Sequence, residues 1–115
     1  MMYMSIDLQN IVDQVDNLFQ VKKADLHPGD KIQLKTKNSV YYIVVDIDGN
    51  YIVSGGWFDK MSMSPIKTTI KGCTWGGSII KTDIVAACGL NLEFGNRLLT
   101  SAIQKIIVFP GFRRN

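Results

Sequence analysis

The chain has 115 residues, of which 46% are hydrophobic and 20% charged, and its formal net charge is +3. This composition predicts one domain over residues 1–115 and excludes intrinsic disorder, which requires low hydrophobicity and a large net charge. No apolar run is long enough to span a bilayer, and the first residues lack the pattern of a secretory signal. Two cysteines, Cys73 and Cys88, fit neither a disulfide framework nor a metal spacing, so we expect free thiols in a cytoplasmic protein.

Charge divides the chain into an acidic head and a basic body. Residues 1–30 hold five aspartates against two lysines, for a net charge of −3. Residues 31–115 hold eight lysines and three arginines against five acids, for a net charge of +6. Such asymmetry marks either a partner surface or, as we favour, a solvated helix face beside a mildly basic sheet.

The acidic head predicts an amphipathic helix over residues 5–20. Its apolar residues recur at helical spacing in one continuous stripe, formed by Leu8, Ile11, Val12, Val15, Leu18 and Phe19. Ser5 is a suitable N-cap, and Asp7 in the first turn suits the positive end of the helix dipole. We expect Leu8, Val12, Val15 and Phe19 to be buried.

After His27 the apolar period changes from 3.6 to 2, which predicts a β-rich body over residues 31–109. Pro28-Gly29 indicates a turn before a half-buried strand at 31–35. The segments 40–46 and 51–54 are predicted to form a hairpin around Asp48-Gly49-Asn50. Further strands are expected at Thr68–Trp75, Ile79–Lys81, Ile84–Cys88 and Leu90–Phe94.

The C-terminal segment 97–109 fits either a helix or a strand. We favour a strand, because Thr100-Ser101 suit a helix interior poorly and Ile106 to Phe109 is rich in β-forming residues. Residues 110–115 form a basic tail. The sequence therefore predicts a mostly β fold of the α+β class. It comprises an N-terminal amphipathic helix followed by a small antiparallel barrel or a strongly bent sheet.

Two glycine pairs next to tryptophans are the candidate ligand- or partner-binding residues. The segments 54–58 (Ser-Gly-Gly-Trp-Phe) and 74–78 (Thr-Trp-Gly-Gly-Ser) are near mirror images. In one interpretation they form a shallow aromatic platform, because paired glycines permit close approach and indoles offer flat faces. In the other, which we favour, the glycines are barrel corners and the tryptophans close the barrel ends. The residues concerned are Gly55, Gly56, Trp57, Phe58, Trp75, Gly76 and Gly77.

Residues suited to catalysis are few. His27 is the single histidine and precedes a turn, and both cysteines lie in apolar, strand-like surroundings that disfavour the thiolate. Asp46-Ile47-Asp48-Gly49-Asn50 begins like a calcium loop, but Tyr51 and Trp57 occupy the positions that need glycine and glutamate. We therefore assign no catalytic residue, no metal site and no cofactor.

Three classes of function remain open. We favour a non-catalytic binding or assembly module that acts through protein contacts or forms a homo-oligomer. A second class is a small barrel that binds single-stranded nucleic acid on its basic body, with Tyr41 or Tyr42, Tyr51 and Trp57 as stacking residues. The third is an enzyme with an atypical carboxylate or thiol site.

Overall fold

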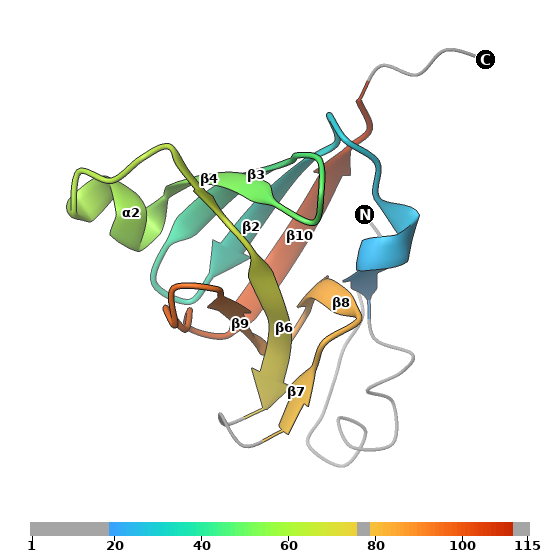
Figure 1. Ribbon diagram of the computed structural model, residues 1–115. Helices are drawn as coiled ribbons and strands as arrows, with labels where there is room; N and C mark the ends of the chain where they lie inside the picture. Colours follow the sequence, from blue (N-terminus) through green and yellow to red (C-terminus); the bar gives the residue numbers. More distant parts are fainter. Residues whose placement is uncertain (1–18, 76–78, 112–115) are drawn as a thin grey trace.

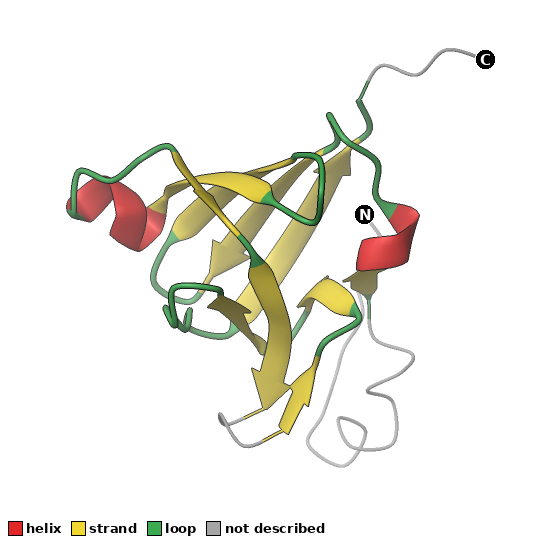
Figure 2. Ribbon diagram, viewed as in Figure 1, coloured by secondary structure: helices red, strands yellow, loops and turns green. Residues whose placement is uncertain are grey.

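The computed structural model of the protein describes residues 19–75 and 79–111, which are almost entirely β structure (Figures 1 and 2). Two short helical segments interrupt the strands: the 3₁₀ helix η2 (Lys23–Asp25) and the α-helix α2 (Gly56–Lys60). The strands are β1 (Gln20–Lys22), β2 (Lys31–Thr36), β3 (Val40–Val45), β4 (Tyr51–Gly55), β5 (Ile66–Thr68), β6 (Ile70–Trp75), β7 (Ile79–Lys81), β8 (Ile84–Ala87), β9 (Asn91–Phe94) and β10 (Ile103–Phe109).

In these described ranges the strands pair into three antiparallel sheets. The largest has the order β10-β2-β3-β4-β5, a second has the order β7-β6-β9, and β1 pairs with β8. In Figure 1 the large sheet lies above, with α2 beyond the end of β4, while β6 and β7 run downward from it. A core of buried aliphatic and aromatic side chains joins the sheets.

The predicted hairpin is confirmed. In β2, Ile32 and Leu34 are buried and Lys31 and Lys35 are exposed, so this strand alternates as its sequence indicates. Strands β3 and β4 pair in register around residues 46–50, and the amide of Asp46 donates to the carbonyl oxygen of Asn50 at 2.9 Å. The C-terminal segment is also a strand, as favoured, because β10 pairs with β2 along its length.

The single strand expected over Thr68–Trp75 is two strands in different sheets. The chain leaves the large sheet at Thr69, whose carbonyl oxygen accepts a hydrogen bond from the amide of Gly95 at 2.8 Å. Strand β6 then passes close to Lys81. A Cβ on Gly72, which has φ +143°, would overlap the Lys81 carbonyl group, so the close approach of β6 to Lys81 requires glycine.

The expectation of an α+β fold that begins with a helix over residues 5–20 is wrong where the structure describes that segment. Gln20 belongs to β1 and pairs with Ala87 of β8, and Phe19 is 49% exposed. Pairing with a neighbouring strand outweighs the local helical period at this end of the stripe. Residues 5–18, including Leu8, Val12 and Val15, lie outside the described residues.

The expectation of a barrel is also wrong. The large sheet ends in β10 on one side and in β5 on the other, and these two strands do not pair with each other among the described residues. The reason is the break at Thr69, where the chain enters a second sheet instead of extending the first until it closes.

Candidate functional site

The first glycine–tryptophan segment forms α2, which is anchored by one fully buried ring. Phe58 has no exposed surface and packs against Phe94 with ring centroids 5.2 Å apart and planes at 79°. Its ring also lies edge-on to Tyr41, at 6.1 Å, and to Trp57, at 5.5 Å. Edge-to-face pairs of this kind add to the stabilisation that burial itself provides. The short helix is therefore held in one position by the core.

The glycine pair is explained by the approach of α2 to β3. Gly55 has φ +91° and Gly56 has φ +46°, and a Cβ on Gly56 would overlap the ring of Tyr41. A Cβ on Gly55 would overlap the carbonyl oxygen of Val40. These glycines are thus required by packing at the corner between β4 and α2.

Two hydrogen bonds fix the first turn of α2. The amide of Trp57 donates to the hydroxyl oxygen of Tyr41 at 3.3 Å, and the amide of Gly55 donates to Asp59 Oδ1 at 3.0 Å. The hydroxyl of Ser64 and then the Gly55 amide stabilise the charged form of Asp59, which lowers the pKa of its carboxyl group. The start of the helix is therefore tied to β3 through Tyr41 and to the last turn of the helix through Asp59.

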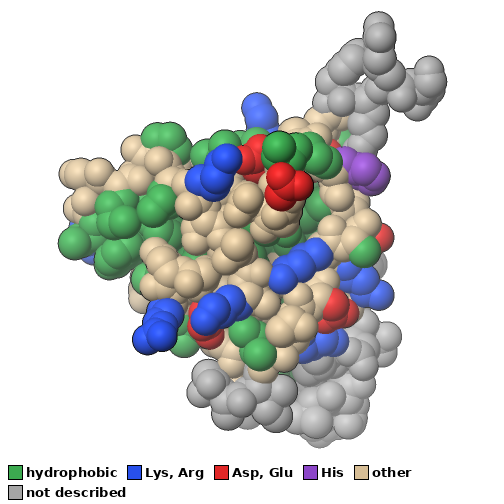
Figure 3. Space-filling model, in the orientation of Figure 1, with side chains coloured by type: hydrophobic (Ala, Val, Ile, Leu, Met, Phe, Trp, Pro, Cys, Tyr) green, Lys and Arg blue, Asp and Glu red, His purple; other side chains and the backbone are tan. Residues whose placement is uncertain are grey.

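The outer side of this anchored corner carries exposed apolar side chains, with the exposed Asp59 and Lys60 between them. Met61 is 52% exposed and Met63 is 38% exposed, and both follow the half-buried Trp57 on the same short segment. Their amides donate to the carbonyl oxygens of Trp57 and Phe58, at 3.0 and 2.8 Å. Figure 3 shows hydrophobic side chains gathered over α2, on the left of the molecule. We call Trp57, Met61 and Met63 the α2 surface.

The second glycine–tryptophan segment lies elsewhere. Trp75 ends β6, pairs with Ile79 and is 45% exposed. Figure 1 places the end of β6 at the bottom of the molecule, well separated from α2. Gly76 and Gly77 lie outside the described residues. The two tryptophans therefore do not share one platform, and Phe58 is unavailable to any surface because it is fully buried.

The thiols are poorly placed for nucleophilic chemistry. Burial raises the pKa of Cys73 to about 12, and its sulfur lies 3.5 Å from the carbonyl oxygen of Val85. Burial also raises the pKa of the half-buried Cys88. Both cysteines are free. His27, the single histidine of the sequence, is exposed in the loop before β2. Neither thiol has the lowered pKa that marks a reactive cysteine.

The basic side chains of the body are partly neutralised by acids. Lys67 Nζ lies 3.1 Å from Asp46 Oδ2, and Lys71 Nζ lies 3.6 Å from Glu93 Oε2. Figure 3 shows the visible lysines and arginines dispersed, with acidic groups between them. Of the tyrosines considered for base stacking, Tyr41 and Tyr51 are buried and Tyr42 is exposed.

Two further observations concern the part of the chain that the structure describes. No group of three His, Cys, Asp or Glu side chains in it could hold a metal ion. None of its helices has the length and apolar character needed to cross a membrane.

Sequence reasoning missed α2 and the exposed methionines. A five-residue helix gives too short a periodic signal to be recognised. The signal that was available is the run Trp-Phe-Asp-Lys-Met-Ser-Met, residues 57–63, which no strand alternation explains. An aspartate four residues after a glycine is also suited to accept the amide of that glycine, as Asp59 does here.

Comparisons with known proteins give one distant similarity. No protein-family model matches the chain, and no solved structure matches it. The chain is 30% identical, over 112 aligned residues, to a protein of Methanocaldococcus jannaschii named as a putative cation-transporting ATPase. The alignment covers 84% of this chain but 13% of the ATPase, so the chain is similar to a small portion of a much longer protein.

Proposed function

We propose that the protein is a non-catalytic, cytoplasmic binding module that docks a protein partner on its α2 surface. The observation that carries the proposal is the exposure of Met61 and Met63 beside a helix whose Phe58 is fully buried. A surface that is already held in place loses little conformational entropy on binding. Aromatic residues and methionine are enriched at protein interfaces, where the flexible thioether adapts to the partner.

The chemistry of the thiols supports a non-catalytic role. Burial raises the pKa of both Cys73 and Cys88, which disfavours the nucleophilic form. Two free thiols are also compatible with a reducing compartment, which supports the cytoplasmic location.

The similarity to a portion of a cation-transporting ATPase supports a modular role. Within a protein that is several times longer, we propose that such a portion acts through contacts with the surrounding parts. The partner of this chain is therefore expected to be a protein surface with exposed apolar side chains, complementary to the α2 surface.

The proposal is tested by photocrosslinking in cells that express the full chain. Benzoylphenylalanine is placed at position 61, on the α2 surface, and in a control at position 109, which is 48% exposed on β10. We expect a discrete covalent adduct at position 61 and none at position 109. The position-61 adduct should disappear when Met63→Asp is added, because a charge at the contact resists desolvation.

The outcomes identify the partner or contradict the proposal. An adduct of twice the chain mass identifies a second copy as the partner, and a larger protein adduct identifies another chain. Equal adducts at positions 61 and 109, or an adduct unchanged by Met63→Asp, contradict docking on the α2 surface. Retention of the protein on single-stranded oligonucleotides that falls steeply with salt favours the nucleic-acid class instead.

A further inference from the structure

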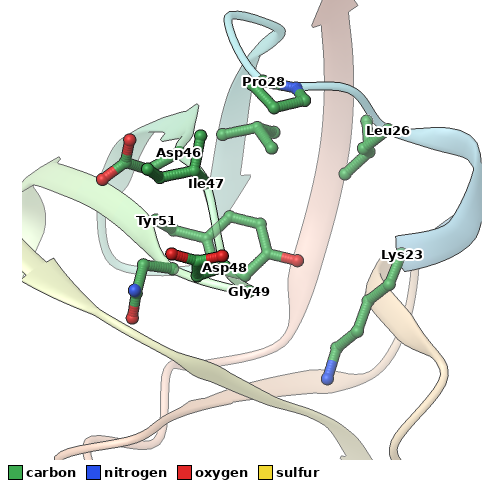
Figure 4. Close-up of a pocket in the computed structure, with 10 residues that line it drawn as sticks. Lys23, Leu26, Pro28, Asp46, Ile47, Asp48, Gly49 and Tyr51 are labelled. Carbon is green, nitrogen blue, oxygen red and sulfur yellow. The ribbon is translucent and has the colours of Figure 1, made fainter.

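A cavity of about 410 Å³ opens at the opposite end of the β3–β4 hairpin from α2 (Figure 4). One wall is formed by η2 and the loop that follows it, with Lys23, Leu26 and Pro28. The other wall is the hairpin turn, residues 46–50, and Val45 and Tyr51 line the space between the walls. The volume falls in the range of sites that hold small molecules or single side chains.

The walls are fixed by backbone hydrogen bonds, so the cavity is already formed without a ligand. The amide of Gly29 donates to the carbonyl oxygen of Val45 at 2.9 Å, and the amide of Val45 donates to the carbonyl oxygen of Asp30 at 2.8 Å. The buried carboxylate of Asp30 accepts bonds from the amides of His27 and Gly111, at 2.9 and 2.7 Å. A site held in this way does not lose binding free energy to reorganisation.

The lining combines apolar surface with hydrogen-bond donors. Leu26, Pro28, Val45 and Ile47 provide the apolar portion. The ring of Tyr51 is 5% exposed, and in Figure 4 its hydroxyl points toward the side where Lys23 and Leu26 lie. Burial raises the pKa of Tyr51 above its ordinary value, so the hydroxyl keeps its proton as a donor.

Lys23 supplies a positive charge at the same cavity. Its ammonium group makes a long contact, 3.5 Å, with the carbonyl oxygen of Lys71. Partial burial lowers the pKa of Lys23, and the Coulomb interaction with Asp83 offsets this lowering only in part. No carboxylate of the described residues lies within 4.0 Å of it. A lysine side chain has enough rotatable bonds to turn its ammonium group toward a bound anion.

The acidic residues of the turn limit which anions fit. Asp46 is paired with Lys67 at 3.1 Å, whereas the carboxylate of Asp48 is exposed beside the opening. That charge repels polyanions more than it repels a group with a single charge. From this arrangement we infer that the cavity binds an aliphatic monocarboxylate. The carboxylate meets Lys23 and the Tyr51 hydroxyl, and the aliphatic part packs on Leu26 and Val45.

Two sources supply this chemistry, namely a free small acid and the C-terminal residue of a polypeptide. N-acetyl-leucine represents the polypeptide terminus, and 4-methylpentanoate represents the free acid. N-acetyl-leucine amide has the same apolar body without the carboxylate and is the matched negative probe. Inorganic phosphate tests the discrimination against higher charge.

The experiment titrates the full chain with each probe and follows backbone amide shifts by NMR. We expect N-acetyl-leucine or 4-methylpentanoate to shift residues 23–28 and 45–51 with a dissociation constant of about 1 mM, as suits so small a ligand. The tighter of the two identifies the source. The amide and phosphate should bind about tenfold more weakly or worse.

Variants locate the carboxylate. Lys23→Met keeps the aliphatic stem, Tyr51→Phe removes only the hydroxyl, and each should weaken binding about tenfold. Lys22→Met and Tyr42→Phe, which change an exposed lysine and an exposed tyrosine outside the cavity, should leave affinity within about twofold. A well-dispersed amide spectrum shows that each variant is folded.

Equal binding of the acid and its amide overturns the inference, as does the absence of saturable shifts at about 50 mM probe. Unchanged affinity in both Lys23→Met and Tyr51→Phe overturns it as well. The test does not involve Met61 or Met63, so its failure leaves the proposed docking on the α2 surface intact.

Discussion

The two glycine–tryptophan segments are near mirror images in sequence, yet their tryptophans have different surroundings. Trp57 packs against Phe58, and its amide is bonded to the Tyr41 hydroxyl, whereas Trp75 stands 45% exposed at the end of β6. The difference lies in the neighbouring residue. Phe58 follows Trp57 and enters the core, while the neighbour that precedes Trp75 is the buried Thr74 of the same strand. A shared motif therefore does not imply a shared site.

The largest expected effect is at the anchor of the first segment. Phe58→Ala should lower the free energy of unfolding by about 3–5 kcal/mol, because a fully buried ring leaves a cavity against Phe94 and Tyr41. Urea denaturation followed by circular dichroism measures the change. Phe109→Ala, at an exposed position of β10, is the control and should lower the free energy of unfolding by about 1 kcal/mol or less. A Phe58→Ala loss as small as that of the control would contradict the anchoring of α2.

A smaller effect is expected at the glycine pair. Gly56→Ala should lower the free energy of unfolding by about 2–4 kcal/mol, because the new Cβ overlaps the Tyr41 ring and φ is positive. Gly49→Ala is a matched control, since Gly49 also has positive φ (+74°) but a Cβ added there would meet no atom within 4 Å. Gly49→Ala should lower the free energy of unfolding by about 1 kcal/mol. Equal losses in the two variants would show that only backbone strain, and not close approach, selects glycine at the corner.

Replacing either tryptophan should lower the free energy of unfolding by less than replacing Phe58 or Gly56. Trp57→Ala should cost about 2 kcal/mol through lost packing on Phe58, and Trp75→Ala about 1 kcal/mol or less. In the same pair of variants, acrylamide should quench the remaining fluorescence more strongly when Trp75 is the tryptophan retained. Equal quenching would mean that the two indoles have the same exposure, against the comparison above.

How far the sequence predicts this molecule depends on the element. The strands of residues 31–54 were predictable, because alternation of Ile32, Leu34 and their neighbours is a local signal that the sheet preserves. The strand at Gln20 was not, since its partner, Ala87, lies far away along the chain. The break at Thr69 depends likewise on Gly95 from a distant turn. Contacts of that kind override local periodicity and leave little trace in it.

The candidate site follows the same rule. The sequence indicated Gly55, Gly56 and Trp57, and these residues do form the corner between β4 and α2. The two glycines permit close packing against β3, however, and the exposed surface at this corner also includes Met61 and Met63. The cavity was out of reach of sequence reasoning. It joins Lys23 to Tyr51 across two elements, and neither residue stands out by spacing or motif.

The smallest expected effect is a difference in thiol reactivity, which tests how abruptly β6 passes from the interior to the surface. Cys73 lies two residues before the exposed Trp75, yet burial raises its pKa to about 12, so its reactive thiolate form is disfavoured in neutral solution. The pKa of Cys88 is also raised, but this thiol is half-buried, and we expect iodoacetamide to modify Cys88 first. Both rates should rise with pH, because a raised pKa shifts thiolate formation to more alkaline solution. Peptide mapping by mass spectrometry at several pH values measures the two rates, with the urea-unfolded chain as the reference in which they converge.

Trp75→Ala should leave Cys73 protected, because Val85 and the core, rather than the indole of Trp75, shield the thiol. Rapid modification of Cys73 in that variant would show instead that Trp75 closes the end of β6, and the contrast between the two tryptophans would disappear.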